Sequence, residues 1–239
     1  MNSDPSTINI NVPEFIEEQY RKYNNEGFII DDPVSVPHQF KSVQDIEVSG
    51  LLTALISWGR RSQILLNAND MMDRLENSPH HFIVTADDSE LSEVSKGFVH
   101  RTFNEKDFYH TLRALKAVYT NYDSLDNLFA EFAIKNQDMG MIISSFSAFM
   151  CSFESPSRLR KHYADPLAGS AAKRICMFLR WMVRKDGNGV DFGIWHSLRP
   201  SQLMCPLDVH SGRVARSLGL LKRKQNDWKA VLELTENLR

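Results

Sequence analysis

One lysine in the second half of the sequence, Lys173, could act as a nucleophile. Ser170 follows Gly169 and is a good N-cap, so Lys173 is predicted to lie in the first turn of a helix over Ser170–Lys185. A cation there opposes the helix dipole by about 0.3–1 kcal/mol, which favours the neutral amine. Only the neutral amine attacks carbon, so Lys173 is a candidate nucleophile. An ordinary solvated surface lysine would give the same pattern.

A carboxylate that could assist this lysine follows 35 positions later, at Asp208. Pro206 blocks helix before it, and Asp208 is an ideal N-cap for a helix ending at Leu218, with Val214 and Leu218 expected to face the core. A carboxylate at a helix start is ionised and rigidly aimed. Plain capping, worth about 1 kcal/mol, is the simpler interpretation and is compatible with catalysis. We expect Lys173 and Asp208 to meet across a cleft.

Positive charge is concentrated around these two residues. Net charge is −2 for the whole chain, but residues 156–224 hold 14 Lys and Arg against 4 Asp and Glu, whereas residues 1–155 hold 12 against 23. A basic segment in a near-neutral protein indicates a polyanionic partner such as nucleic acid. A basic lobe packed on an acidic one would explain the same distribution.

The elements that position these residues are predicted to be helices, since no run shows convincing strand alternation. We therefore predict an all-α fold. Residues 24–44 and 78–104 are expected to be loops with short helical pieces, and Asp45 is expected to cap its helix. The remaining predicted helices are Glu14–Tyr23, Asp45–Trp58, Arg60–Leu75, Asp107–Tyr119, Ser124–Ile134, Met139–Phe153, Pro156–Tyr163 and Asn226–Leu238.

From its composition we expect the chain to be a cytoplasmic protein. No apolar run reaches the roughly 18 residues of a membrane helix, and the N-terminus lacks the basic and apolar parts of a signal peptide. The three cysteines, Cys151, Cys176 and Cys205, form neither a disulfide framework nor a zinc pattern, and they are too few for an iron–sulfur cluster. We expect reduced thiols, no metal, no organic cofactor and a monomer.

The segment PLDVHSGRVARSLGL resembles the part of helix-hairpin-helix DNA glycosylases, such as endonuclease III, that carries the catalytic aspartate. The stretch GSAAKRICMFLRWMVR is similar to the lysine-bearing helix after the hairpin, especially in archaeal 8-oxoguanine DNA glycosylase. This resemblance places Lys173 at the nucleophile position and Asp208 at the aspartate position. In the hairpin itself, ADPLAGSAAKR keeps Gly169 but not the usual two-glycine turn.

A longer pattern resembles a bacterial family of undefined function within this HhH-GPD superfamily. It includes GRRSQ at Gly59–Gln63, FLRWMVR ending at Arg184 and DFGIW at Asp191–Trp195. The resemblance covers nearly the whole chain and implies two lobes that form one functional unit. One lobe is a helical bundle over 45–163, and the other combines 1–44 with 164–239 and carries the hairpin-like region.

The resemblance also implies residues that contact DNA. Gln63 or Arg61 could fill the gap left by a flipped base, and Trp181 and Trp195 could stack on that base, although core packing would equally account for both tryptophans. His210 could contact DNA or bond locally. The basic candidates are Arg60, Arg61, Arg158, Arg160, Lys161, Arg174, Arg180 and Arg213.

Together these features predict a DNA repair glycosylase, with AP-lyase activity if Lys173 forms a Schiff base. The partner would be double-stranded DNA with a damaged base, an oxidised base being one candidate. Two alternatives remain open at this point. The chain could be a DNA-binding module that keeps the fold without the chemistry, or a helical adaptor whose basic face meets an acidic protein.

Overall fold

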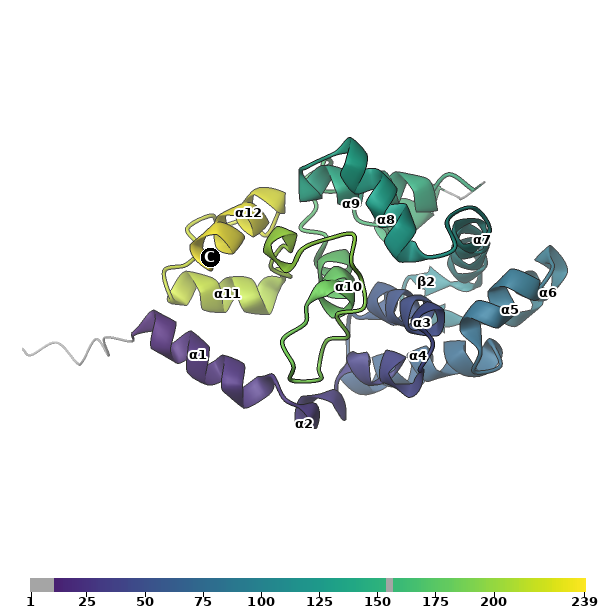
Figure 1. Ribbon diagram of the computed structural model, residues 1–239, viewed down its shortest axis with the longest axis horizontal. Coiled ribbons are helices and arrows are strands. Elements are labelled where there is room, and N and C mark those ends of the chain that lie inside the picture. Colours follow the sequence, from purple (N-terminus) through teal and green to yellow (C-terminus); the bar gives the residue numbers. More distant parts are fainter. Residues whose placement is uncertain (1–10, 154–156) are drawn as a thin grey trace, which may run out of the picture.

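The structure is a computed structural model that describes residues 11–153 and 157–239, without the side chains of residues 157 and 158. It is mostly helical (Figure 1), which confirms the predicted all-α class. The N-terminal part contains α1 (Val12–Tyr23), α2 (Glu26–Ile29), the 3-10 helices η1 (Pro33–Ser35) and η2 (Pro37–Gln39), α3 (Val43–Ile56), α4 (Arg61–Arg74), α5 (Pro79–Thr85) and α6 (Asp88–Ser95). The remainder contains β1 (Val99–His100), β2 (Phe103–Asn104), α7 (Glu105–Tyr122), α8 (Leu125–Lys135), α9 (Met139–Met150), η3 (Ser157–Lys161), α10 (Lys173–Val183), η4 (Pro200–Gln202), α11 (Val209–Ser217) and α12 (Trp228–Asn237).

Most helices begin at side chains that satisfy their first amide groups. Asn104 caps α7 and Ser124 caps α8, as short polar side chains do. The prediction that Asp45 caps its helix is wrong, because Ser42 caps α3 and accepts from the Asp45 amide at 3.1 Å. The Asp45 carboxylate instead accepts from the His80 amide at 2.9 Å, which joins α3 to α5.

Helix α3 forms the centre of the core. Every residue from Ile46 to Ile56 is buried, so this helix is covered on all sides, as expected for one that is apolar all round. Helix α10 packs against it. Gly50 permits this close approach, since a Cβ there would lie 3.0 Å from the Met182 methyl group. The buried apolar residues form one cluster that runs from Val34 to Leu234.

A buried carboxylate, Glu47 of α3, joins three parts of this core. It accepts hydrogen bonds from the Trp195 indole at 2.6 Å, the Tyr119 hydroxyl at 3.0 Å and the Leu125 amide at 3.1 Å. The Asp126 amide donates to it as well, at 3.2 Å. Burial raises the pKa of Glu47 despite these four donors. The carboxylate thus fixes α8 and the segment after α10 to α3.

One expectation about local structure needs correction, because the helix predicted over Pro156–Tyr163 is only a 3-10 helix at Ser157–Lys161. Residues 78–104 contain the expected short helices, α5 and α6. A small antiparallel pairing of β1 and β2 was not expected there, and Arg101 is left-handed (φ 55°) at its turn. Within the described ranges, no helix combines the length and apolar character needed to cross a bilayer.

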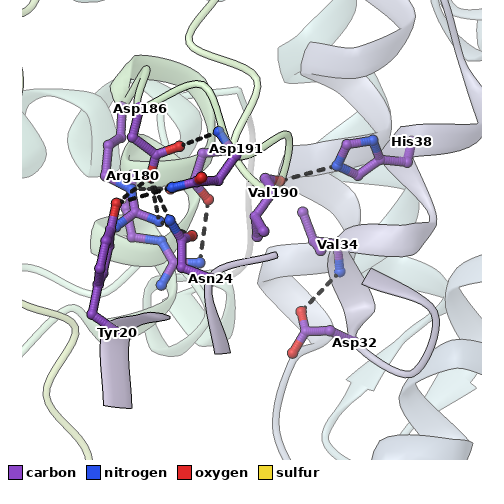
Figure 2. A network of polar contacts seen from close by, with 11 residues as sticks. Tyr20, Asn24, Asp32, Val34, His38, Arg180, Asp186, Val190 and Asp191 are labelled. Atoms are coloured by element: carbon purple, nitrogen blue, oxygen red, sulfur yellow. Dashed lines mark hydrogen bonds and ion pairs between the residues drawn. The ribbon is translucent and has the colours of Figure 1, made fainter. Parts of the chain in front are cut away.

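Polar contacts hold the N-terminal segment on the loop that follows α10 (Figure 2). The Arg184 guanidinium donates to Asn24 Oδ1 at 2.9 Å and to the buried Asp191 carboxylate. Asp186 accepts from the Tyr20 hydroxyl at 3.1 Å and from Asn24 Nδ2 at 2.7 Å. Helix α1 has no buried residues, so these hydrogen bonds are its main described polar link to the loop.

Candidate functional site

The two residues singled out in the sequence lie together. Lys173 Nζ is 3.5 Å from Asp208 Oδ2, and both side chains are about one-third exposed, at 33% and 36%. They come from the first residue of α10 and from the N-cap of α11. The predicted approach of the two side chains across a cleft is therefore confirmed.

The local structure before Lys173 differs from the prediction. Ser170 does not cap α10, which begins at Lys173 itself. Ser170 pairs with Asp227 in an isolated β-bridge, and its hydroxyl accepts from the Ala172 amide at 3.2 Å. Ala172 is left-handed (φ 46°), a conformation that is costly for a residue with a Cβ. This sharp bend turns the chain into α10 and places Lys173 at the very start of the helix.

The two oxygens of the Asp208 carboxylate have different partners: Oδ1 accepts hydrogen bonds from its own helix, and Oδ2 faces Lys173. Its Oδ1 accepts from the His210 amide at 2.8 Å, the Ser211 amide at 2.9 Å and the Ser211 hydroxyl at 3.2 Å. Partial burial works to raise the pKa of Asp208, but these donors and the Lys173 charge outweigh it, and the pKa lies below its usual value. The carboxylate is therefore ionised, with Oδ2 aimed at Lys173.

Helix α11 presents a different face to the core than predicted. Val214 is 48% exposed, and Leu218 is only partly buried. The buried residues are Gly212 and Ala215. A Cβ on Gly212 would lie 2.6 Å from Asn226 Oδ1, so glycine is needed where Asn226 approaches the helix. Asn226 in turn donates to the Asp208 carbonyl at 3.2 Å and steadies the start of α11.

Lys173 and Asp208 line a cavity of about 680 Å³. This volume falls within the range of about 300–1,000 Å³ usual for small-molecule sites. The walls come from η1, the end of α3, the start of α4, the segment around α10 and the start of α11. Residues with polar or aromatic side chains in these walls are Asp32, Ser57, Trp58, Arg61, Lys161, Ser170, Lys173, Arg174, Asp208, His210 and Asn226.

An aromatic ring on the cavity wall packs against a half-buried cation. The Arg174 guanidinium lies 4.7 Å from the centre of the Trp58 ring and donates to the carbonyls of Leu55 and Lys161. Burial lowers the pKa of Arg174 to about 10, so the guanidinium stays charged at neutral pH. Arg174 was predicted to contact DNA, but its donors are directed to internal carbonyls and to the Trp58 ring. Its position thus gives it a structural role.

The tryptophans predicted to stack on a base are core residues. Trp181 is 1% exposed and Trp195 is 3% exposed, so neither ring can reach a ligand in the cavity. Trp195 packs between Phe129 and Phe178 and donates to Glu47. The alternative of core packing is confirmed for both residues. Trp58 is the tryptophan that lines the cavity.

The other basic candidates are spread around the cavity and beyond it. Arg61 and Lys161 are exposed and line it. Arg60 and Gln63 are exposed at the start of α4, and the Gln63 amide donates to Asn67 at 2.8 Å. Arg160 and Arg213 are exposed too and, like Arg60 and Gln63, lie outside the cavity wall. The prediction for Arg158 falls on a side chain outside the described part of the structure.

Part of the positive charge of residues 156–224 is used internally. Arg180, a predicted DNA contact, pairs with the buried Asp191 at 3.3 Å, and Arg184 pairs with the same carboxylate. Arg216 donates to Asn226 Oδ1 at 2.7 Å, and Arg223 pairs with Asp227. The net charge of residues 156–224 therefore overstates the positive charge available to a polyanion. The exposed cations around the cavity are better candidates for contact with one.

The wall residues that sequence reasoning missed include Asp32, Trp58 and Asn226. Asp32 falls in a segment predicted to be a loop, and no local pattern marks it as a site residue. Another missed residue is Arg101, whose side chain crosses Gly59 so closely that a Cβ on the glycine would lie 2.7 Å from the guanidinium. Within the described residues, no three His, Cys, Asp or Glu side chains are grouped to hold a metal ion.

Comparison with known families shows which family the chain belongs to. Residues 32–239 match the family described as Protein of unknown function (DUF2400), and the chain belongs to this family. No curated protein and no solved structure shows a significant match. The matched range begins at Asp32 and includes every wall residue of the cavity.

Proposed function

We propose that the chain is a DNA glycosylase with lyase activity, which removes a damaged base flipped out of duplex DNA. The observation that carries the proposal is the contact of Lys173 Nζ with Asp208 Oδ2, 3.5 Å apart in the wall of one cavity. An amine beside a fixed carboxylate is an arrangement suited to nucleophilic catalysis with a proton acceptor at hand. The resemblance of the Lys173 and Asp208 segments to helix-hairpin-helix glycosylases, and a two-lobed fold of that kind, belong to the same proposal.

The reaction begins with a proton transfer from the Lys173 ammonium to Asp208 Oδ2. The free amine then forms a bond to the anomeric carbon of the sugar, while the bond from that carbon to the base breaks. The base leaves with the electron pair and takes up the proton that Asp208 Oδ2 received, which restores the carboxylate. Because Oδ1 of Asp208 is held by the His210 and Ser211 amides, Oδ2 keeps its aim as charge develops on the sugar.

The lyase step follows from the covalent bond to Lys173. The bond from the anomeric carbon to the ring oxygen then breaks, and the ring oxygen takes up a proton from the adduct nitrogen. The product is an imine, a Schiff base between Lys173 Nζ and the anomeric carbon. Loss of a proton from the neighbouring sugar carbon then expels the 3′ phosphate and breaks the strand. Water hydrolyses the imine and returns the free lysine, so the reaction needs no external oxidant or reductant.

The cavity walls supply what binding of a flipped nucleotide requires. Flipping costs a few kcal/mol of lost stacking, which a ring such as Trp58 can partly return. Trp58 replaces Trp181 and Trp195 in this role. Arg61 and Lys161 lie exposed in the same wall, where they can meet the flanking phosphates.

A panel of duplexes, each with one damaged base, tests the proposal. After incubation, hot alkali should cut the strand at the damaged position for at least one lesion with the wild-type protein and for none with Lys173→Ala. Lys161→Ala is the matched control, since it removes a lysine from the same cavity wall but not the nucleophile; it should weaken DNA binding, and cleavage should persist at saturating protein. Binding without cleavage on every lesion would favour a non-catalytic DNA-binding module, and absence of both would favour an adaptor for an acidic protein.

A further inference from the structure

We propose that Asp32 selects the base that enters the cavity, by accepting hydrogen bonds from an edge with two adjacent N–H donors, as on guanine-type bases. The inference rests on the proposed function for the cavity's role in holding a flipped base. It adds the chemical class of that base and a specificity-determining residue outside the Lys173–Asp208 pair.

Asp32 offers the cavity an acceptor that the protein leaves partly unused. It is half-buried in the cavity wall, at the N-cap of η1, and its Oδ1 accepts from the Val34 amide at 3.1 Å. Within the described residues, Oδ2 has no hydrogen-bond donor and the carboxylate has no ion-pair partner. Asp208 differs in this respect, because its own Oδ2 already faces Lys173.

The surroundings of Asp32 favour a ligand that brings donors. Burial raises the pKa of Asp32, and it is opposed by the Val34 amide and by the charges of Arg61, Arg180 and Lys173. These cations act from a distance, without direct contact. Oδ2 of Asp32 is therefore open to a ligand that brings hydrogen-bond donors into the cavity.

The geometry of a carboxylate decides which base edge suits it. An ionised carboxylate only accepts, and its two coplanar oxygens match two parallel N–H donors. The guanine edge presents such a pair, from its ring N–H and its amino group. A hypoxanthine edge keeps only the ring N–H, so one of the two hydrogen bonds from the base to Asp32 would be lost. Each such pairing changes discrimination by about 1–3 kcal/mol, or roughly 5- to 150-fold.

The segment that carries Asp32 is held rigidly enough to discriminate. His38, after η1, bonds to the Val190 carbonyl at 3.0 Å (Figure 2). It also stacks on Phe192, and Pro33 and Val34 are buried. The neighbouring Asp31 is exposed and lies outside the cavity wall. It provides a matched control that has the same charge one residue away.

Calorimetric titration of the full chain with guanosine and with inosine tests the inference, since these nucleosides differ only in the amino group. Wild type and Asp31→Asn should bind guanosine at least tenfold more tightly than inosine. In Asp32→Asn the preference should fall to within about twofold, because the NH2 group of asparagine, a donor, would face an N–H donor of the base. Asparagine is also a good N-cap, so the variant should fold, and denaturant unfolding verifies this.

Three results would overturn the role of Asp32. They are equal binding of both nucleosides by wild type, a preference that survives in Asp32→Asn, and no binding of either at millimolar concentration. Cleavage of damaged duplexes by the same preparations is scored separately. Lys173-dependent cleavage without the guanosine preference would overturn Asp32 alone, and the preference without cleavage would overturn the glycosylase chemistry alone.

Discussion

Replacing Asp208 by asparagine should separate its chemical role from its structural one. Asparagine caps helices about as well as aspartate, so the hydrogen bonds from the His210 and Ser211 amides to Oδ1 can be kept. What disappears is the negative charge facing Lys173 and the atom that accepts its proton. We therefore expect a large loss of activity with a small loss of stability.

The size of each effect can be estimated from the geometry. Loss of the charge at the start of α11 costs about 0.3–1 kcal/mol. The ion pair with Lys173 adds less than about 1 kcal/mol, because both side chains are about one-third exposed and the attraction is screened by solvent. The free energy of unfolding should thus fall by roughly 1 kcal/mol. Removal of a general base lowers a rate by about 100- to 10,000-fold.

The pH dependence of stability provides an independent measure of the charge. The folded-state pKa of Asp208 lies below its usual value of 3.8, so the ionised group stabilises the fold above that pH. This contribution is lost as the pH falls through the folded-state pKa. The difference in unfolding free energy between wild type and Asp208→Asn should therefore be full at pH 7 and shrink in strongly acidic solution.

Urea unfolding at several pH values, with single-turnover cleavage of a damaged duplex, measures both quantities. Asn226→Asp is not a suitable control, because it would place a third carboxylate in a cavity wall that already holds Asp32 and Asp208. Ser217→Ala, at the exposed end of α11, is a better one. A stability loss above about 3 kcal/mol, or cleavage within threefold of wild type, would refute the reasoning about Asp208.

Three further changes test other parts of the structure. Glu47→Gln should lower the unfolding free energy by about 1–3 kcal/mol, because in either orientation the glutamine NH2 group would face a backbone donor, the N–H of Leu125 or that of Asp126. An unchanged urea midpoint would contradict this. DNA binding should weaken with salt: if roughly six phosphates are neutralised, the slope of log affinity against log salt concentration should be near −5. Arg61→Ala should make this slope shallower by about 1, whereas Lys106→Ala, outside the cavity wall, should leave it unchanged. Arg184→Ala should speed tryptic cleavage of α1, since α1 lacks buried residues and depends on Asn24 and Asp186 for attachment, and an unchanged cleavage pattern would exclude that role.

Much of the fold could be predicted from local signals. Helical spacing and capping residues placed most helices to within a few residues, and Asp208 was correctly identified as a cap. The start of α10 was misplaced because Ala172 adopts a left-handed conformation that only the surrounding structure imposes. Trp181 is a similar case. Its type fits both stacking and packing, and only the three-dimensional fold shows it is buried.

Part of the candidate site could be predicted from the sequence. Lys173 and Asp208 are marked by their helix starts and by family resemblance, so their contact was expected. Asp32 and Trp58 belong to segments that meet the pair only through tertiary packing, and neither has a sequence pattern that distinguishes it. The charge of residues 156–224 was a weaker guide, because Arg180 and Arg223 are used in internal ion pairs.

The central claim is that Lys173 is the nucleophile, and covalent trapping tests it most directly. Borohydride reduces a Schiff base to a stable amine, so incubation with a damaged duplex should give a protein–DNA adduct. Peptide mapping by mass spectrometry should place the modification on Lys173, and Lys173→Ala should give no adduct while Lys161→Ala still does. An adduct that maps to Lys161, or that persists in Lys173→Ala, would contradict the account, as would DNA binding without an adduct on any lesion.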